Sequence, residues 1–189
     1  MPNNYEFGIS KTHVAFFDPE ATSGDYAAPE AMPGTVNISI TPAGETTEHY
    51  HDNGKAGEEI SNNGYTGSVE QSIFPDAVLA EMQGHTIDDN GGIVESSNDK
   101  PKEFALMFET EGDEEKIRTV FYRVKAQRPS EDHQTSNPSP NISTKNMDLS
   151  MMAEDKSGEK YVKYSLKESD TGFDTFFDEV PMPTITTGA

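Results

Sequence analysis

Apolar and polar residues alternate along several short runs of this chain, which is the pattern of strands that bury one face. The run at 35–41 is the clearest, because every second residue in it is Val or Ile, and the run at 65–73 follows the same period. The inward positions of the two runs are Val36, Ile38, Ile40, Tyr65, Val69 and Ile73. The outward positions are Thr35, Asn37, Ser39, Thr41, Thr66, Ser68, Glu70 and Ser72. Both runs therefore predict half-buried strands that carry a polar face.

One helix is predicted at 75–83, directly after the second of these runs. Pro75 needs no N–H in a first turn, and the Asp76 carboxylate suits the positive end of the helix dipole. Gly84 is expected to end the helix. Its single apolar stripe consists of Val78, Leu79 and Met82.

Further strands are predicted at 12–17, 104–108, 116–125, 147–151 and 161–166. A turn at 111–113 joins two of them into a meander, and 171–179 is expected to form a helical turn that carries Phe173, Phe176 and Phe177. Six or seven short strands with one helix predict a mainly β fold, a sandwich or a barrel.

The chain is expected to form a single domain over 1–189 with three long irregular segments. The connection at 42–63 is polar and contains Asp52-Asn53-Gly54, a hairpin-tip signal. An excursion of this length inside a compact domain needs a reason, usually a functional one or disorder. The segment 129–145 is rich in Ser, Pro and Asn and predicts a mobile loop, and 180–189 predicts a frayed tail.

The charge balance is strongly acidic, with 34 Asp and Glu against 14 Lys and Arg, for a formal net charge of −20. This is the opposite of a nucleic-acid-binding footprint, which neutralises phosphates with bases. Five bases crowd into one predicted strand and its end: Lys116, Arg118, Arg123, Lys125 and Arg128. They form either a solvated or guarded strand edge or a contact with an acidic neighbouring subunit. The candidates for such a contact are Lys116, Arg118 and Arg123.

The sequence offers little chemistry. It contains no cysteine, and no run approaches the ~20 apolar residues that span a bilayer, so we expect no membrane partner. The sequence His49-Tyr50-His51-Asp52 lacks a third zinc ligand at a recognisable spacing. The sequence at 88–92 departs from a calcium loop in its glycine register. We therefore expect neither an enzyme nor a bound cofactor or metal.

A set of segments, taken in order, carries a resemblance to a known family: 32–40 (Met-Pro-Gly-Thr-Val-Asn-Ile-Ser-Ile), 44–48, 62–67 and 74–76, and then 88–91, 104–109, 112–116 and 120–130. These segments resemble a major tail protein, the tail-tube subunit of long, non-contractile-tailed phages and prophages of siphovirus type from Gram-positive hosts. It covers about residues 5–152. The connection at 49–60 is more charged than that family pattern, and the C-terminal third is only loosely similar.

The resemblance implies a β-sandwich subunit that self-assembles into stacked hexameric rings, a virion tail tube assembled in the host bacterial cytoplasm. The implied partners are further copies of the chain, a tape-measure protein and tail-terminator or tip proteins, and DNA passes the lumen without specific binding. Only 32% of the residues are hydrophobic, which suits a chain that completes its burial by assembly. An acidic wall also suits a conduit, because a lumen that bound phosphates would stall DNA.

The candidate site residues follow from this reading. The candidate inter-ring loop comprises His49, Tyr50, His51, Asp52 and Lys55. The candidate lumen-facing residues are Asn37, Ser39, Ser68, Glu70 and Ser72. Two other classes remain open: an acidic β-rich binding module, such as a capsid-decoration or adhesin domain, and a metal-dependent hydrolase built on the His49 cluster.

Overall fold

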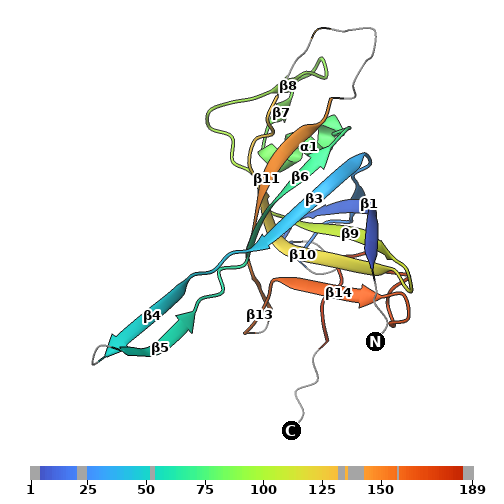
Figure 1. The fold of residues 1–189 in the computed structure, drawn as a ribbon. Coiled ribbons are helices and arrows are strands. Elements are labelled where there is room, and N and C mark those ends of the chain that lie inside the picture. Colours follow the sequence, from blue (N-terminus) through green and yellow to red (C-terminus); the bar gives the residue numbers. More distant parts are fainter. Residues whose placement is uncertain are drawn as a thin grey trace.

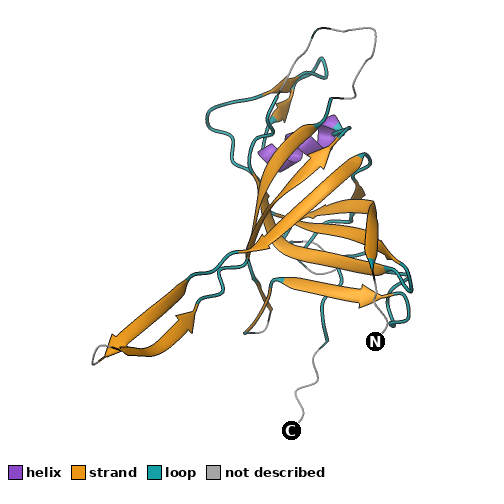
Figure 2. Cartoon of the chain, in the orientation of Figure 1, coloured by secondary structure: helices purple, strands orange, loops and turns teal. Residues whose placement is uncertain are grey.

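The structure is a computed structural model, and it describes residues 5–20, 25–51, 54–131, 135, 143–156 and 158–184. It is mainly β with one short helix, as the alternation predicted (Figure 2). The strands are β1 (Glu6–Phe16), β2 (Glu30–Ala31), β3 (Thr35–Pro42), β4 (Thr46–His51), β5 (Gly54–Ile60), β6 (Tyr65–Gln71), β7 (Thr86–Ile87), β8 (Ile93–Val94), β9 (Phe104–Gly112), β10 (Ile117–Ala126), β11 (Lys145–Met151), β12 (Glu154–Lys156), β13 (Glu159–Tyr161) and β14 (Lys163–Lys167).

An antiparallel sheet of eight strands forms the body, in the order β2-β1-β9-β10-β11-β6-β3, with β14 paired to β10 off this path (Figure 1). The first half of β10 pairs with β14, and its last three residues pair with β11. The change of partner coincides with a register shift between Phe121 and Val124, where Arg123 has φ of 46°. A bulge of this kind bends a strand and re-aims its side chains, and here it lies where β10 changes its partner from β14 to β11.

Strand β9 is buried on both faces, which explains its continuous apolar sequence. Phe104, Leu106 and Phe108 point into the main core with Val69, Met147 and Leu149 of the neighbouring strands. Ala105 and Met107 point into a second core, which the C-terminal segment covers with Leu166, Phe173 and Phe176. The C-terminal third therefore completes the fold.

The helix α1 (Asp76–Gln83) ends where the sequence predicted and begins one residue later, because Pro75 is extended and forms its N-cap; Gly84 follows its end with φ of 71°. Its buried face differs from the predicted stripe. Val78, Ala80, Met82 and Gln83 are buried, whereas Leu79 is only partly buried. Among the described residues no helix is long and apolar enough to cross a membrane.

Met82 should consequently carry more of the stability of this helix than Leu79. Met82 is 0% exposed in the main core, and an aspartate there would be buried without a partner, at a cost of several kcal/mol. We expect Met82→Asp to be insoluble or to lose most of its urea resistance. Leu79→Asp is the matched control, because its carboxylate can reach water, and it should stay soluble. Equal urea midpoints for the two variants would contradict this packing.

Two predicted inward positions are wrong. Val36 is 51% exposed because a register shift between Thr35 and Asn37 leaves it outside the pairing with β6. Ile73 is 60% exposed because β6 ends at Gln71, which takes the buried position instead. The predicted strand at 161–166 is divided between β13 and β14, and 171–179 forms successive turns in place of a helical turn.

Candidate assembly surfaces

A two-stranded hairpin, β4–β5, projects from the body and is called the arm below (Figure 1). It occupies most of the connection predicted at 42–63. Thr46 pairs with Ile60 at its base and His51 with Gly54 near its end. Backbone bonds join the arm to the sheet, from the Ala43 N–H to the Gly64 carbonyl (2.9 Å) and from the Asn63 N–H to the Ala43 carbonyl (2.8 Å). The arm is therefore a continuation of the β3–β6 pair.

The arm shows no core of its own in the residues whose burial the structure describes. All of its residues whose burial is described are exposed, and Ile60 is 72% exposed. Lys55 lies between Glu48 and Glu58, 2.7 Å and 2.5 Å from their carboxylate oxygens. An isolated two-stranded hairpin is marginally stable in water, so this surface gains from a partner that covers it. The predicted His49, Tyr50, His51 and Lys55 lie on the strands of the arm, while Asp52 lies outside the described residues.

The predicted polar faces of β3 and β6 meet in one surface, and β11 extends it. Ser39 lies opposite Ser68, which lies opposite Asp148. The flanking rows are Thr41, Thr66 and Ser150 on one side and Asn37, Glu70 and Asn146 on the other. These nine residues are called the polar face below. All are exposed or half-buried, and the opposite face of the same strands holds Val69, Met147 and Leu149 in the core.

Ser72 is not part of the polar face, although the sequence placed it there. It follows the end of β6, is half-buried, and donates its hydroxyl hydrogen to the Gly34 carbonyl at 2.9 Å. Asn37, Ser39, Ser68 and Glu70 do lie together on adjacent strands. The three β11 residues, Asn146, Asp148 and Ser150, were missed as candidates, although the alternation at 147–151 marks Asp148 and Ser150 as outward positions and Asn146 continues the same period.

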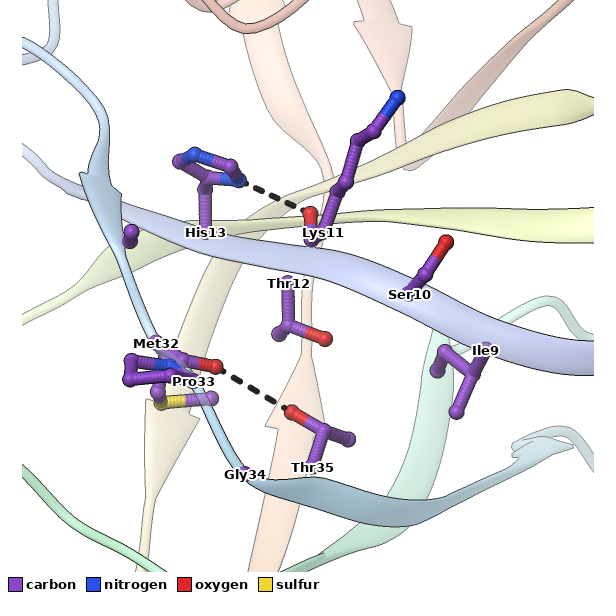
Figure 3. A pocket seen from close by; sticks show the side chains of 10 residues that line it. Ile9, Ser10, Lys11, Thr12, His13, Met32, Pro33, Gly34 and Thr35 are labelled. Atoms are coloured by element: carbon purple, nitrogen blue, oxygen red, sulfur yellow. Dashed lines mark hydrogen bonds between the residues drawn. The ribbon is translucent and has the colours of Figure 1, made fainter.

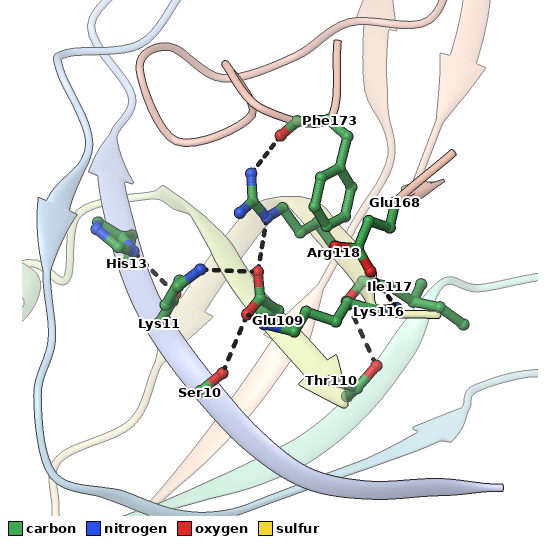
Figure 4. A network of polar contacts seen from close by, with 10 residues as sticks. All are labelled: Ser10, Lys11, His13, Glu109, Thr110, Lys116, Ile117, Arg118, Glu168 and Phe173. Carbon is green, nitrogen blue, oxygen red and sulfur yellow. Dashed lines mark hydrogen bonds and ion pairs between the residues drawn. The ribbon is translucent and has the colours of Figure 1, made fainter. Parts of the chain in front are cut away.

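A buried carboxylate forms ion pairs on the face of β1, β9 and β10 that the C-terminal turns cover (Figure 4). The Glu109 side chain is 1% exposed, and Arg118 Nε donates to its Oε2 at 2.8 Å. Lys11 Nζ lies 3.1 Å from the same oxygen, and Lys116 Nζ lies 3.7 Å from Oε1. Burial would raise the pKa of Glu109, but the bonds from Arg118 and Lys11 outweigh it and hold the pKa below its usual value.

The same arginine holds the C-terminal turns in place. Its guanidinium carbon lies 3.9 Å from the centroid of the Phe173 ring and 4.9 Å from that of Phe177, and its Nη1 donates to the Phe173 carbonyl. The Phe177 ring stacks on His13 at 4.5 Å. A charge paired on one side and stacked on aromatic rings on the other is well satisfied although buried.

Arg123 is paired within the chain too. It forms ion pairs with Glu103 and, at 3.5 Å, with Glu154, and it lies 4.0 Å from the centroid of the Phe17 ring. Arg118 and Arg123 thus have intramolecular roles that the sequence did not predict. The pairing of Arg118 with Glu109 could have been inferred from the β9–β10 hairpin, because its register places the two residues opposite each other. Contact of Lys116, Arg118 and Arg123 with a neighbouring subunit stays a prediction.

A pocket of about 380 Å³ lies between β1 and the segment that leads into β3 (Figure 3). The Thr12 side chain points into it, and its hydroxyl has no hydrogen-bond partner in the described part of the chain. The Thr35 hydroxyl donates to the Met32 carbonyl at 3.4 Å. Among the described residues no group of three or more potential metal ligands comes together. The arm and the polar face are therefore better candidates for a functional site than this pocket.

A comparison with protein-family models matches residues 8–183 to the phage tail tube protein family. The chain belongs to that family. A search of the curated proteins gives no match to this chain. The match to the tail tube family extends through the C-terminal turns that carry Phe173 and Phe177, beyond the part of the sequence that carried the resemblance. The chain is thus a structural tail tube protein that self-assembles into the tube of a virion tail.

Proposed function

We propose that this tail tube protein assembles as stacked rings of six copies, with the polar face toward the channel through which DNA leaves the capsid. The observation that carries the proposal is the polar face itself, in which three adjacent strands present small hydroxyl and amide side chains together with Glu70 and Asp148. Such a wall is hydrated and repels phosphate, so DNA slides along it without binding.

The acidity of the whole chain supports this choice. Six copies at −20 each give a formal charge of −120 per ring, and Arg118 and Arg123 are already paired with carboxylates inside their own chain. The arm is proposed as the element that joins successive rings. The tape-measure protein and the terminator or tip proteins are its proposed partners, and assembly is proposed to take place in the host cytoplasm without catalysis by this chain.

Size exclusion followed by negative-stain microscopy of the purified protein tests the ring proposal. We expect rings and tubes with a central channel. Discrete monomers or trimers at all concentrations would favour the acidic binding module instead, and a zinc-dependent hydrolytic activity would favour a site at His49.

A charge reversal on the polar face tests the channel. Glu70 lies in its third row and accepts a hydrogen bond from the Thr144 hydroxyl at 2.6 Å. Phages that carry Glu70→Lys should assemble but eject DNA more slowly, most visibly at low salt, where screening is weak. The control is Asp178→Lys, an exposed change in the C-terminal turns. Equal ejection rates for Glu70→Lys and wild type at low ionic strength would remove Glu70 from the channel wall.

A further inference from the structure

Strand β14 is an edge strand whose outer side is open. Among the described residues it pairs only with β10. The Val162 carbonyl accepts a bond from the Tyr122 N–H (3.0 Å), and the Glu168 N–H donates to the Lys116 carbonyl (2.9 Å). Because alternate residues of an antiparallel strand bond to a given neighbour, the N–H and C=O groups of Lys163 and Ser165 point to the open side.

A groove of about 440 Å³ lies beside this edge. Phe108, Ile117 and Phe121 supply its apolar lining, and Lys163, Ser165 and Lys167 line it from β14. Glu6 and Asp170 line it as well, so the positive charge of the groove is concentrated on β14. Lys163 makes no ion pair within the described part of the chain, and its ammonium lies 5.7 Å from the centroid of the Phe121 ring. An unpaired base beside an apolar groove and an open strand edge is a surface suited to an acidic strand.

The arm has the complementary properties. Residues 46–60 contain four acids against one lysine, and that lysine is shared by Glu48 and Glu58. Residues 159–167 contain three lysines against one glutamate, and of these lysines Lys167 pairs with Glu115. In the described part of the chain, β4 and β5 pair only with each other, so each has an open edge. Strand β5 ends with Glu58, Glu59 and the exposed Ile60. The arm projects away from the sheet that carries β14 (Figure 1), so its partner strand belongs to another copy.

We infer that the open edge of β14 and its groove form the docking site for the arm of a second copy, which adds β5 to the sheet as a further strand. This inference rests on the proposed function and names the receptor of the arm. Backbone bonds to Lys163 and Ser165 provide the affinity, and the charges of Lys163 and the β5 carboxylates set the orientation.

Cross-linking tests the contact directly, because the chain contains no cysteine. Tubes of the double variant Ile60→Cys/Ser165→Cys are assembled under reducing conditions and treated with a short bismaleimide. We expect ladders of covalent oligomers on denaturing gels. Ile60→Cys alone and Ser165→Cys alone should give none, and Ile60→Cys/Ser39→Cys is the matched control on the polar face. Tubes without ladders, or a Ser165→Cys protein that links to itself, would overturn the docking site while the tube stands.

A charge change at the same site gives a second readout. Lys163→Glu should raise the protein concentration needed for tube growth by about tenfold or more, since it opposes like charges across the contact. Lys160→Glu makes the same change three residues away, on exposed β13 and outside the groove, and should have little effect. Equal effects of the two substitutions would overturn the site. A wild-type protein that forms no tubes under any condition would overturn the proposed function, and the docking site with it.

Discussion

The Arg118→Leu variant is expected to lose about 3 kcal/mol or more of its free energy of unfolding, because it leaves a buried carboxylate without its main partner. Glu109 is 1% exposed, and Arg118 is its closest cation at 2.8 Å. The substitution also removes the group that lies against the Phe173 ring and bonds to its carbonyl. Urea unfolding at neutral pH measures the loss.

Two controls separate the charge from the packing. Lys116→Leu removes a cation 3.7 Å from the same carboxylate and should cost less than 1 kcal/mol, since Lys116 is partly exposed and its pair is weak. The double variant Glu109→Leu/Arg118→Leu should regain much of the loss, because no uncompensated charge stays buried. The ammonium groups of Lys11 and Lys116 lose the same partner, but both side chains are partly exposed and reach water. A single Arg118→Leu variant as stable as wild type would contradict the role of this pair.

The pair also predicts acid sensitivity. The pKa of Glu109 is held below its usual value, so the carboxylate is stabilised in the folded state relative to the unfolded one. This contribution is fully present above the ordinary glutamate range and is lost as the pH falls through the lowered pKa. The acid-unfolding midpoint of Arg118→Leu should therefore lie at a higher pH than that of wild type.

Removal of the arm is expected to abolish tube formation and leave the subunit folded. The cleanest variant joins Glu45 to Ser61 through Asn-Gly, a dipeptide that forms a tight hairpin turn. It keeps the bond from the Ser61 N–H to the Glu45 carbonyl (2.9 Å) and the pairing of Ala43 with Gly64. The body keeps its core, because no arm residue whose burial is described belongs to either core. Melting should thus match wild type, while microscopy should show only monomers or isolated rings. Tubes of normal length from this variant would contradict the role of the arm.

The β class, the helix and the polar face could be predicted because local signals agree there. Alternation at 35–41 and 65–73 reflects the period of a strand, and Pro75 and Gly84 bound the helix through their own backbone preferences. The errors at Val36 and Ile73 come from one bulge and one strand end. The bulge and the strand end each move a residue away from its expected face, and neither can be recognised from the hydrophobic pattern.

The long-range contacts could not be predicted in the same way. Arg118 and Arg123 stand out as bases, but their partners Glu109, Glu103 and Glu154 are among 34 acids, and only the fold selects them. The second core likewise depends on the C-terminal turns. Phe173 in these turns contacts Arg118, which is 55 residues earlier in the sequence. The open edge of β14 follows from a change of partner along β10, which no single segment encodes.

A cryo-electron microscopy reconstruction of the assembled tube tests the orientation of the subunit most directly. The row of Ser39, Ser68 and Asp148 should line the channel, with the row that contains Glu70 beside it, and the second core under the C-terminal turns should lie away from the channel. A channel lined by the C-terminal turns and the face of β1, β9 and β10 that they cover, with the polar face on the exterior of the tube, would contradict the proposal.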